Sequence, residues 1–256
     1  MNINNENIWV TGGSSGIGRE LTCMLADLGN YVIISGRDKN KLEETRSHDQ
    51  KRIITLACDV SNRDSMNAAA IEIQNLTDSL DRVIFSAGTC EYVDNISQLD
   101  PALFRRVFDA NFFGVVNCVE VAIPFLKKAQ KHGHIVGISS LSSAVPFPRA
   151  EAYGASKAAL DYFLESLRMD IHQHNIDVSL VSPGFVDTPL TARNDFPMPF
   201  LMDAKQAASI IIKGMIARKK HIVFPKRLGW LLEMGNLFPG LWFRLMHARM
   251  NERSGI

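Results

Sequence analysis

Short apolar runs alternate with longer amphipathic stretches over most of the chain. The short runs are rich in β-branched residues, as are strands that a parallel sheet buries on both faces. The long stretches repeat apolar residues at helical spacing. We therefore expect strands at residues 8–11, 31–35, 53–57, 82–86, 134–139, 177–182 and 221–224. We expect helices at residues 16–28, 64–75, 112–131, 152–174 and 204–217.

The alternation of strand and helix predicts an α/β fold, in which helices flank one doubly wound parallel sheet of about seven strands. Crossovers between parallel strands are right-handed, so the helices return to both faces of the sheet. The length of 256 residues suits a single domain over residues 1–256. No internal repeat or low-complexity linker divides the chain.

The regular alternation ends near Phe196, where the sequence FPMPF brings in two prolines. We expect residues 190–256 to form a substrate lid and a C-terminal extension within the same domain. Residues 228–250 are apolar and aromatic, but charged and helix-breaking residues interrupt them. They therefore lack the uninterrupted apolar run of about 20 residues that spans a bilayer.

The C-terminal extension is also basic, since residues 218–253 hold eight Lys or Arg and two Glu. One interpretation is peripheral contact with an anionic membrane, with Trp230, Trp242 and Phe243 as interfacial anchors. The other is that the extension covers the substrate pocket or an oligomer interface. The sequence leaves both interpretations open.

Composition and charge are those of an ordinary soluble globular protein. Hydrophobic residues make up 46% and charged residues 21%, and the formal net charge is +1. This balance gives no global attraction to nucleic acid, so we expect no DNA or RNA partner. The four cysteines form no C-x-x-C pair, which indicates reduced thiols. The N-terminus has no basic region followed by an apolar stretch, so we expect a cytoplasmic protein, with membrane association left open by its extension.

A glycine-rich loop follows the first expected strand, IWVT, and opens a helix. Glycines permit close approach of the backbone, and the helix N-terminus offers free N–H groups to a pyrophosphate. This context favours a dinucleotide, and the alternative is a tight turn without a ligand. The loop lacks the lysine of a P-loop, which counts against ATP or GTP hydrolysis. The predicted cofactor contacts are Gly12, Ser14, Ser15, Gly16, Ile17 and Gly18.

The end of the second expected strand reads Ser35-Gly36-Arg37-Asp38, where the adenosine ribose should lie. An acidic residue at that strand end would bind a free 2′-hydroxyl, whereas an arginine can pair with a 2′-phosphate. Arg37 therefore favours NADP(H), and the alternative is a solvated turn arginine. Asp59 and Val60, after the third strand, are candidate contacts to the adenine.

Tyr153 and Lys157 open a helix and lie four residues apart, so their side chains share one face. A free tyrosine has a pKa near ~10 and is a poor acid or base at neutral pH. An adjacent ammonium stabilises the phenolate, which gives the pairing a chemical purpose. The preceding strand ends at Ser139 and Ser140, on the same edge of the sheet as the glycine loop.

Together these motifs resemble the short-chain dehydrogenase/reductase family. The matching pieces are TGGSSGIG at 11–18, CDV at 58–60, SAG at 86–88, Asn111 in NFFG, ISS at 138–140, YGASK at 153–157 and PGFVDT at 183–188. They cover residues 8 to about 190 in the family's order. The resemblance implies a Rossmann-type fold, a nicotinamide cofactor and assembly into a homodimer or homotetramer.

The resemblance assigns four catalytic residues. It implies that Tyr153 is the acid or base at the substrate oxygen. It implies that Lys157 binds the nicotinamide ribose and lowers the pKa of Tyr153. Ser140 would hydrogen-bond the reacting oxygen, and Asn111 would support a water that leads to Lys157. The family's usual separation of serine and tyrosine favours Ser140 over its neighbours Ser139, Ser142 and Ser143.

The resemblance also assigns further cofactor contacts. The segment after the fourth strand contributes Ser86, Ala87 and Gly88, although the family usually has asparagine where this chain has Ser86. This departure weakens the assignment at that position and leaves the proton relay intact. The segment expected to contact nicotinamide contributes Pro183, Gly184, Val186 and Thr188.

We therefore expect an NADP(H)-dependent enzyme, with NAD(H) as the alternative cofactor, that transfers hydride between nicotinamide and a carbonyl or secondary alcohol. Tyr153 would give its proton to the developing alkoxide, and the site needs no metal. One alternative is a catalytically idle dinucleotide sensor or scaffold, which the complete catalytic set disfavours. Another is a membrane-surface protein that handles lipids.

The substrate should be chosen by the loops at residues 141–150 and 190–202. Their apolar content favours a lipophilic carbonyl or alcohol, although apolar residues also serve to pack any closed loop. The apolar residues in question are Val145, Pro146, Phe147, Pro148, Leu190, Phe196, Met198, Phe200 and Leu201.

Overall fold

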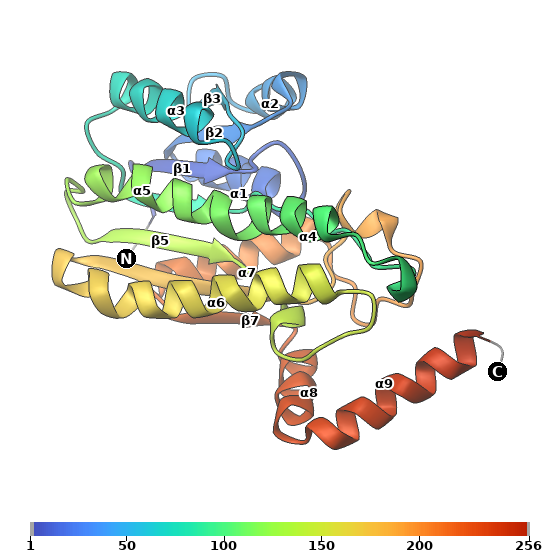
Figure 1. Ribbon diagram of the computed structural model, residues 1–256. Helices are drawn as coiled ribbons and strands as arrows, with labels where there is room; N and C mark the ends of the chain where they lie inside the picture. The colour runs from blue at the N-terminus through green and yellow to red at the C-terminus, as the bar shows by residue number, and fades with distance from the viewer. Residues whose placement is uncertain (1–2, 255–256) are drawn as a thin grey trace.

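Figure 1 shows the computed structural model, which describes residues 3–254, with side chains as far as His247. Arg249, Met250 and Arg253 of the C-terminal extension therefore lie outside the residues whose side chains are described. Seven parallel strands form one sheet in the order β3-β2-β1-β4-β5-β6-β7. The strands are β1 (Asn7–Thr11), β2 (Tyr31–Gly36), β3 (Ile53–Ala57), β4 (Arg82–Phe85), β5 (Gly133–Ile138), β6 (Ile176–Pro183) and β7 (His221–Phe224). The predicted fold class is confirmed.

Strand residues alternate between two hydrophobic cores, because successive side chains point to opposite faces of the sheet. In β1, Ile8 and Val10 belong to one core, and Trp9 between them belongs to the other. In β4, Val83 and Phe85 share the core of Trp9, whereas Ile84 faces the core of Ile8. Both faces are apolar, so the strands appear in the sequence as continuous apolar runs.

Helices cover both faces of the sheet (Figure 1). The core around Trp9 is completed by α3 (Arg63–Leu76), α5 (Gly114–Leu126) and α6 (Glu151–Ile171). The core around Ile8 is completed by α1 (Gly16–Asp27), α2 (Lys39–Arg46) and α7 (Ala204–Ile216). The strand order reverses between β1 and β4, and in open α/β sheets ligands bind in the crevice at the carboxyl ends of strands at such a reversal, so a ligand is expected there.

Two short helices, α2 and α4 (Pro101–Phe108), were not predicted from the sequence pattern. Asp38 caps α2 by accepting hydrogen bonds from the backbone N–H groups of Asn40 and Lys41. Asp100 likewise caps α4 by accepting from a backbone N–H. Each helix has eight residues, too few for a clear apolar period. The helix expected at 112–131 begins instead with one π-helical turn, Asp109–Phe113, and ends at Leu126.

The helical stretch from Pro101 to Leu126 is long and apolar enough to cross a membrane, judged by length and composition alone. Its second half is α5, whose Val115, Val119 and Ala122 pack into the core around Trp9. This packing identifies α5 as the core helix of a globular domain.

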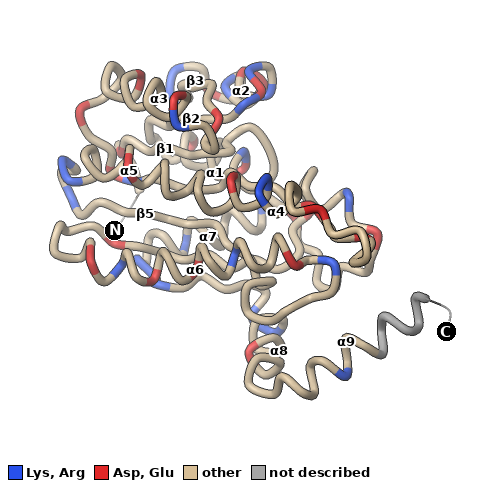
Figure 2. Tube along the Cα trace, in the orientation of Figure 1, with Lys and Arg blue, Asp and Glu red and all other residues tan. Residues whose placement is uncertain are grey.

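The C-terminal extension forms two further helices, α8 (Lys226–Leu237) and α9 (Pro239–Ser254). Leu228, Leu232 and Trp242 pack against Leu141 and Val145, which follow β5. Beyond this contact α9 extends away from the sheet (Figure 1). Figure 2 shows few charged residues on the described part of α9. Large apolar side chains are exposed on this pair of helices, namely Trp230, Leu231, Leu237, Phe238, Leu241, Phe243 and Leu245.

Candidate active site

At two positions of the glycine loop between β1 and α1, the neighbouring backbone lies so close that a side chain would not fit. Gly12 has a φ of +68°, and a Cβ atom there would lie 2.8 Å from the backbone nitrogen of Ala87. A Cβ atom on Gly18 would lie 2.3 Å from the carbonyl oxygen of Gly12. Both contacts are shorter than real Cβ atoms make, so glycine is required at both positions. The loop therefore holds the start of α1 against the end of β4.

The N-terminus of α1 offers free backbone donors at the same place. Ser15 is the N-cap residue, but its side chain makes no capping hydrogen bond, and the first turn carries no acidic residue. The first N–H groups and the positive end of the helix dipole therefore remain available to an anion. Ser14 has its hydroxyl beside Gly36 at the end of β2, and Ile17 packs into the core below.

The segment that follows β6 meets the glycine loop. The side chain of Thr188 would lie 3.0 Å from a Cβ atom on Gly16. Pro183 ends β6, and the N–H of Gly184 donates to the carbonyl oxygen of Phe224 at 2.7 Å. Val186 is buried and pairs with Met202 of the predicted lid. These contacts tie the segment after β6 to the glycine loop, to the end of β7 and to the predicted lid.

Arg37 and Asp38 differ sharply in their surroundings at the end of β2. The Asp38 carboxylate is engaged as the cap of α2. Arg37 is exposed and makes no ion pair with any described residue. Of these two charged side chains, the guanidinium is therefore the one that is free to meet a ligand. That arrangement suits a phosphate better than a ribose hydroxyl.

Thr11 joins the ends of β1 and β4 at Ser86, the position where the family usually has an asparagine. Its hydroxyl accepts hydrogen bonds from the N–H groups of Ser86 and Ala87, each at 3.2 Å. Asp59 accepts from the N–H and the hydroxyl of Ser61, so it shapes its own loop. Val60 is buried beneath the start of α5.

Asn111 lies fully buried in the π-helical turn between α4 and α5. Its Nδ2 donates to the carbonyl oxygen of Thr89 at 2.9 Å and to Ser156 Oγ at 3.0 Å. Its Oδ1 accepts from the N–H of Thr89 at 2.8 Å. A π-turn is rare, and such turns are frequent at functional sites. Here the turn fixes Asn111 between the loop after β4 and the helix that carries Tyr153.

Lys157 is buried with its charged end held at the edge of β5. Its Nζ donates to the carbonyl oxygen of Ile138 at 2.9 Å. A Cβ atom on Gly88 would lie 3.7 Å from this Nζ and 3.0 Å from Asn111 Oδ1, so a larger residue there would crowd the Asn111 amide. Burial lowers the pKa of Lys157 to about 8, although nearby Asp161 acts to raise it.

Tyr153 faces Ser140 and Lys157. The ammonium of Lys157 lies 5.9 Å from the centre of the Tyr153 ring. Burial raises the pKa of Tyr153 to about 12, the Cys90 thiol adds to the rise, and a hydrogen bond with Ser140 lowers it. The sequence predicted that Lys157 would lower this pKa. The net rise is set by burial of the phenol together with Cys90, so the lowering by Lys157 stays a prediction.

The four serines at and after the end of β5 have different neighbours. The Ser140 hydroxyl faces Tyr153 and accepts from the N–H and the hydroxyl of Ser142. The Ser143 hydroxyl donates to the backbone oxygen of Ser140. Ser139 is buried and faces Asp161 on α6. Of the four serines, Ser140 is thus the one that the structure brings to the phenol.

Sequence reasoning missed Asp161, which continues the spacing of Tyr153 and Lys157 along α6. Burial raises the pKa of its carboxyl, while the hydroxyls of Ser139 and Ser143 and the Lys157 ammonium act to lower it. The i, i+4 repeat was the available signal, since it places all three side chains on one helix face.

Sequence reasoning also missed Cys90 and Tyr92, which follow β4 in an irregular segment. The Cys90 thiol interacts with Tyr92, and its charge state is coupled to Lys157 and Tyr153. Burial raises the pKa of this thiol. No spacing rule marks such a segment, so only the tertiary structure reveals that it lies beside the candidate catalytic pair.

Two residues expected to line the substrate pocket have other partners. Val145 is buried against the C-terminal helices, and Phe147 packs edge-to-face on Trp242 with ring centres 5.2 Å apart. The indole N–H of Trp242 donates to the carbonyl oxygen of Pro146 at 2.7 Å. This part of the loop therefore anchors the C-terminal helices α8 and α9.

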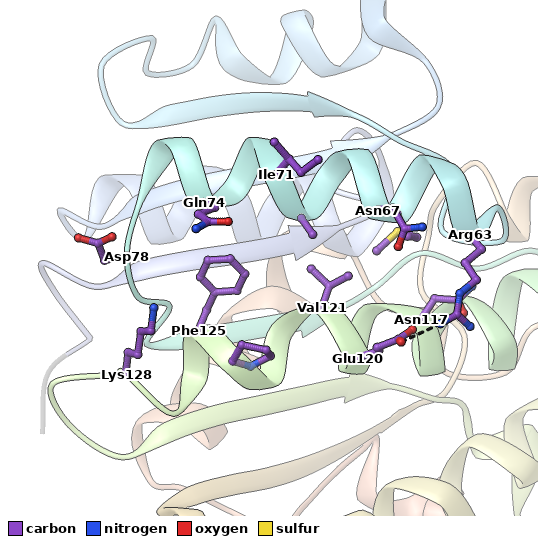
Figure 3. A pocket seen from close by; sticks show the side chains of 13 residues that line it. Arg63, Asn67, Ile71, Gln74, Asp78, Asn117, Glu120, Val121, Phe125 and Lys128 are labelled. Carbon is purple, nitrogen blue, oxygen red and sulfur yellow. Dashed lines mark hydrogen bonds and ion pairs between the residues drawn. The ribbon is translucent and has the colours of Figure 1, made fainter.

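A separate groove of about 360 Å³ lies between α3 and α5 (Figure 3). The Arg63–Glu120 ion pair stands at one end, and Phe125 and Ile71 form part of its apolar wall. None of its lining residues belongs to the predicted cofactor or catalytic set.

Comparison with known proteins finds related sequences over most of the chain. The model of a family described as short chain dehydrogenase matches residues 6–196. An uncharacterized oxidoreductase from Myxococcus xanthus (strain DK1622) is 34% identical over 244 residues, covering 94% of this chain and 96% of that protein. The 11-beta-hydroxysteroid dehydrogenase-like 3 protein of Arabidopsis thaliana is 30% identical over 249 residues, covering 93% and 79%.

Solved structures share the fold at lower sequence identity. A short chain dehydrogenase from Burkholderia cenocepacia J2315, in complex with NADP, has a TM-score of 0.84 at 22% identity, covering 96% of this chain and 99% of that one. A short chain dehydrogenase/reductase from Burkholderia phymatum, in complex with NAD, has a TM-score of 0.85 at 20% identity, covering 94% and 96%. These likenesses support the order and arrangement of the strands.

Proposed function

Because the chain belongs to the short-chain dehydrogenase family, we propose that it is an NADP(H)-dependent oxidoreductase that interconverts a carbonyl group and a secondary alcohol. The observation that carries this proposal is the convergence of Ser140, Tyr153, Lys157 and Asn111 beside the glycine loop. These residues and the loop come from four segments of the chain. A protein that only bound a dinucleotide would have no chemical need for all four side chains.

The crevice fits a dinucleotide. The tight approach of Gly12 to Ala87 and the uncapped N-terminus of α1 suit a pyrophosphate. The free guanidinium of Arg37 suits a 2′-phosphate, so we propose NADP(H) as the preferred cofactor and NAD(H) as the alternative. One solved structure with this fold contains NADP and another contains NAD, which is compatible with either.

When bound, the cofactor supplies or accepts the hydride, and the protein manages the proton. Ser140 would orient the substrate oxygen by donating a hydrogen bond. In the reducing direction, Tyr153 would give its phenolic proton to that oxygen as negative charge develops there. Its raised pKa keeps the phenol protonated at neutral pH, which suits this direction. Lys157 would hold the ribose, and Asn111 would keep the route from Lys157 to solvent in place.

We propose a lipophilic substrate, with residues 190–202 as its lid. Support comes from an aromatic cluster at the sheet edge, where Phe196 packs against Tyr92 and Phe185. The name of the Arabidopsis relative refers to a hydroxysteroid, which is consistent with a large apolar ligand.

We also propose that α8 and α9 meet an anionic membrane surface, while the enzyme itself resides in the cytoplasm as a homodimer or homotetramer. Trp230, 65% exposed, and Phe243, 67% exposed, are suitable interfacial anchors. Lys226 and Arg227 at the start of α8 add positive charge near them.

A cofactor titration followed by a substrate screen tests the proposed function. Binding of NADPH and NADH is measured by fluorescence. Oxidation of the bound reduced cofactor is then followed with steroid ketones, aliphatic ketones and small aldehydes. We expect tighter binding of NADPH and turnover of at least one apolar carbonyl. Binding without turnover of any of these carbonyl compounds would support an idle sensor, and absence of binding would reject both interpretations.

A further inference from the structure

Three loops at the carboxyl edge of the sheet are joined by one side chain, that of Arg149. Its Nε donates to Asp94 Oδ1 at 3.1 Å, in the segment after β4. Its NH1 donates to both carboxylate oxygens of Asp195, at 2.8 and 3.1 Å, in the predicted lid. Arg149 itself lies just before Glu151, the first residue of the catalytic helix α6. The guanidinium therefore links the lid to two fixed segments.

The backbone of Arg149 is held as firmly as its side chain. Its φ is +66°, a left-handed conformation that costs free energy in a residue with a Cβ atom. The carbonyl oxygen of Arg149 accepts a hydrogen bond from the N–H of Val93 at 2.9 Å. The Arg149 side chain is only 28% exposed, so its ion pairs are partly shielded from water. Neither the left-handed backbone of Arg149 nor its partly shielded ion pairs are needed to begin α6.

Tyr92 lies beneath this guanidinium, at the centre of the three loops. The Arg149 guanidinium lies 5.4 Å from the centre of the Tyr92 ring. The Tyr92 hydroxyl donates to Asn194 Oδ1 at 2.7 Å. The Phe196 ring meets Tyr92 edge-to-face, with ring centres 5.6 Å apart. The phenol is thus fixed by the lid on one side and by Arg149 on another.

Tyr92 lies four residues after Gly88, at which a Cβ atom would be 3.7 Å from Lys157 Nζ, so this segment runs beside the candidate catalytic pair. Its hydroxyl interacts with the Cys90 thiol, and both groups are electrostatically coupled to Tyr153. Burial raises the pKa of Tyr92, so its hydroxyl remains a neutral donor to Asn194. The ring therefore stands between the lid and the place where a substrate carbonyl would meet Tyr153.

We propose that Tyr92 is a specificity-determining wall of the substrate pocket and that Arg149 is the positioning residue that clamps the lid against it. The wall limits the size of the group that the substrate carries on the lid side of its carbonyl. The clamp keeps the wall rigid. The statement about specificity rests on the proposed function, whereas the clamp does not.

The clamp is tested by limited trypsin digestion, because Arg193 lies exposed in the lid next to Asn194. Arg149→Gln should speed cleavage after Arg193 about tenfold, since it removes two ion pairs and a cation–π contact. Arg63→Gln is the matched control, because it breaks an exposed arginine pair elsewhere. Equal cleavage rates in the two variants, with equal resistance to urea, would overturn the clamp.

The wall is tested with paired ketones, one compact and one bulky beside the carbonyl. Tyr92→Ala should shift the ratio of kcat/KM towards the bulky ketone about tenfold, mainly through KM, with NADPH affinity unchanged. Tyr92→Phe keeps the ring and should keep the original preference. An unchanged preference in Tyr92→Ala would overturn the wall. If no ketone is turned over by the starting protein, the proposed function fails, and the digestion result still decides the clamp.

Discussion

At the scale of single residues, the neighbours Arg37 and Asp38 differ in whether the protein already provides a partner for the charged group. Asp38 could have bound a ribose hydroxyl, but its carboxylate caps α2. Arg37, one position earlier, is exposed and makes no ion pair with any described residue. We therefore predict that the preference for a cofactor with or without a 2′-phosphate depends on this guanidinium.

Arg37→Asp should lower the affinity for NADPH and leave that for NADH nearly unchanged. A hydrogen bond to a charged group contributes about 1.5–3 kcal/mol, so we expect a loss of roughly ten- to hundredfold. Fluorescence titration with both cofactors measures it. Lys51→Asp, at an exposed position before β3, controls for the change in total charge. An unaltered preference would reject Arg37 as the determinant.

The candidate catalytic residues were predictable from the sequence, and the residues that support them were not. Tyr153 and Lys157 were marked by a short spacing inside a recognisable order of motifs. Tyr92 and Arg149 come from irregular segments, where neither periodicity nor spacing carries information. Their roles depend on contacts between loops far apart in the chain, which only the assembled sheet brings together.

At the scale of elements, long periodic segments were predicted well, and short or unusual ones were not. The strands matched to within about one residue, because their apolar runs report burial on both faces. The π-turn at Asp109–Phe113 has no such pattern, although it holds Asn111 in place. The helices α8 and α9 were seen only as an apolar extension, since their exposed apolar residues obscure any amphipathic period.

The exposed apolar residues of α9 give a direct test of membrane contact. Changing Leu241, Phe243 and Leu245 together to Ser should abolish flotation with anionic liposomes, because these side chains would be buried among lipids. Changing the exposed Ile71 and Leu76 of α3 to Ser is the control. If the α9 variant floats as well as the starting protein, the proposed membrane contact is wrong. A fall in oligomer size instead would identify an interface between copies.

At the scale of the whole molecule, a buried polar network lies at the amino ends of the strands, and the candidate active site lies at their carboxyl ends. Buried Arg82, at the start of β4, donates from Nε to Glu6 at 3.1 Å and also contacts His134 Nδ1. His134 Nε2 is 2.7 Å from Ser179 Oγ, which donates to the backbone oxygen of Lys219 at 2.6 Å. His134 must therefore be neutral, accepting at Nδ1 and donating at Nε2.

The neutral state of His134 predicts acid sensitivity. Burial, with Arg82 adding to it, holds the pKa of His134 well below its usual 6.5. As the pH falls through that usual value, the unfolded chain binds a proton that the folded protein does not bind. The free energy of unfolding should therefore fall by about 1.4 kcal/mol per pH unit.

Urea unfolding from about pH 7 to pH 5 measures this slope. His134→Gln keeps one donor and one acceptor and cannot titrate, so its slope should be smaller, even if its stability at neutral pH is lower. His174→Gln, at an exposed position, should behave as the starting protein does. An equal slope in His134→Gln and the starting protein would contradict the assignment.

The central claim is that the Tyr153 phenol moves the proton during hydride transfer. Tyr153→Phe removes only that oxygen from a site whose cofactor-binding loop lies on other elements. In a single experiment, the variant is titrated with NADPH and then given the best carbonyl substrate. The account predicts NADPH binding within about twofold of the starting protein and a fall in kcat of at least about a hundredfold. Turnover close to that of the starting protein, with the cofactor bound, would contradict it.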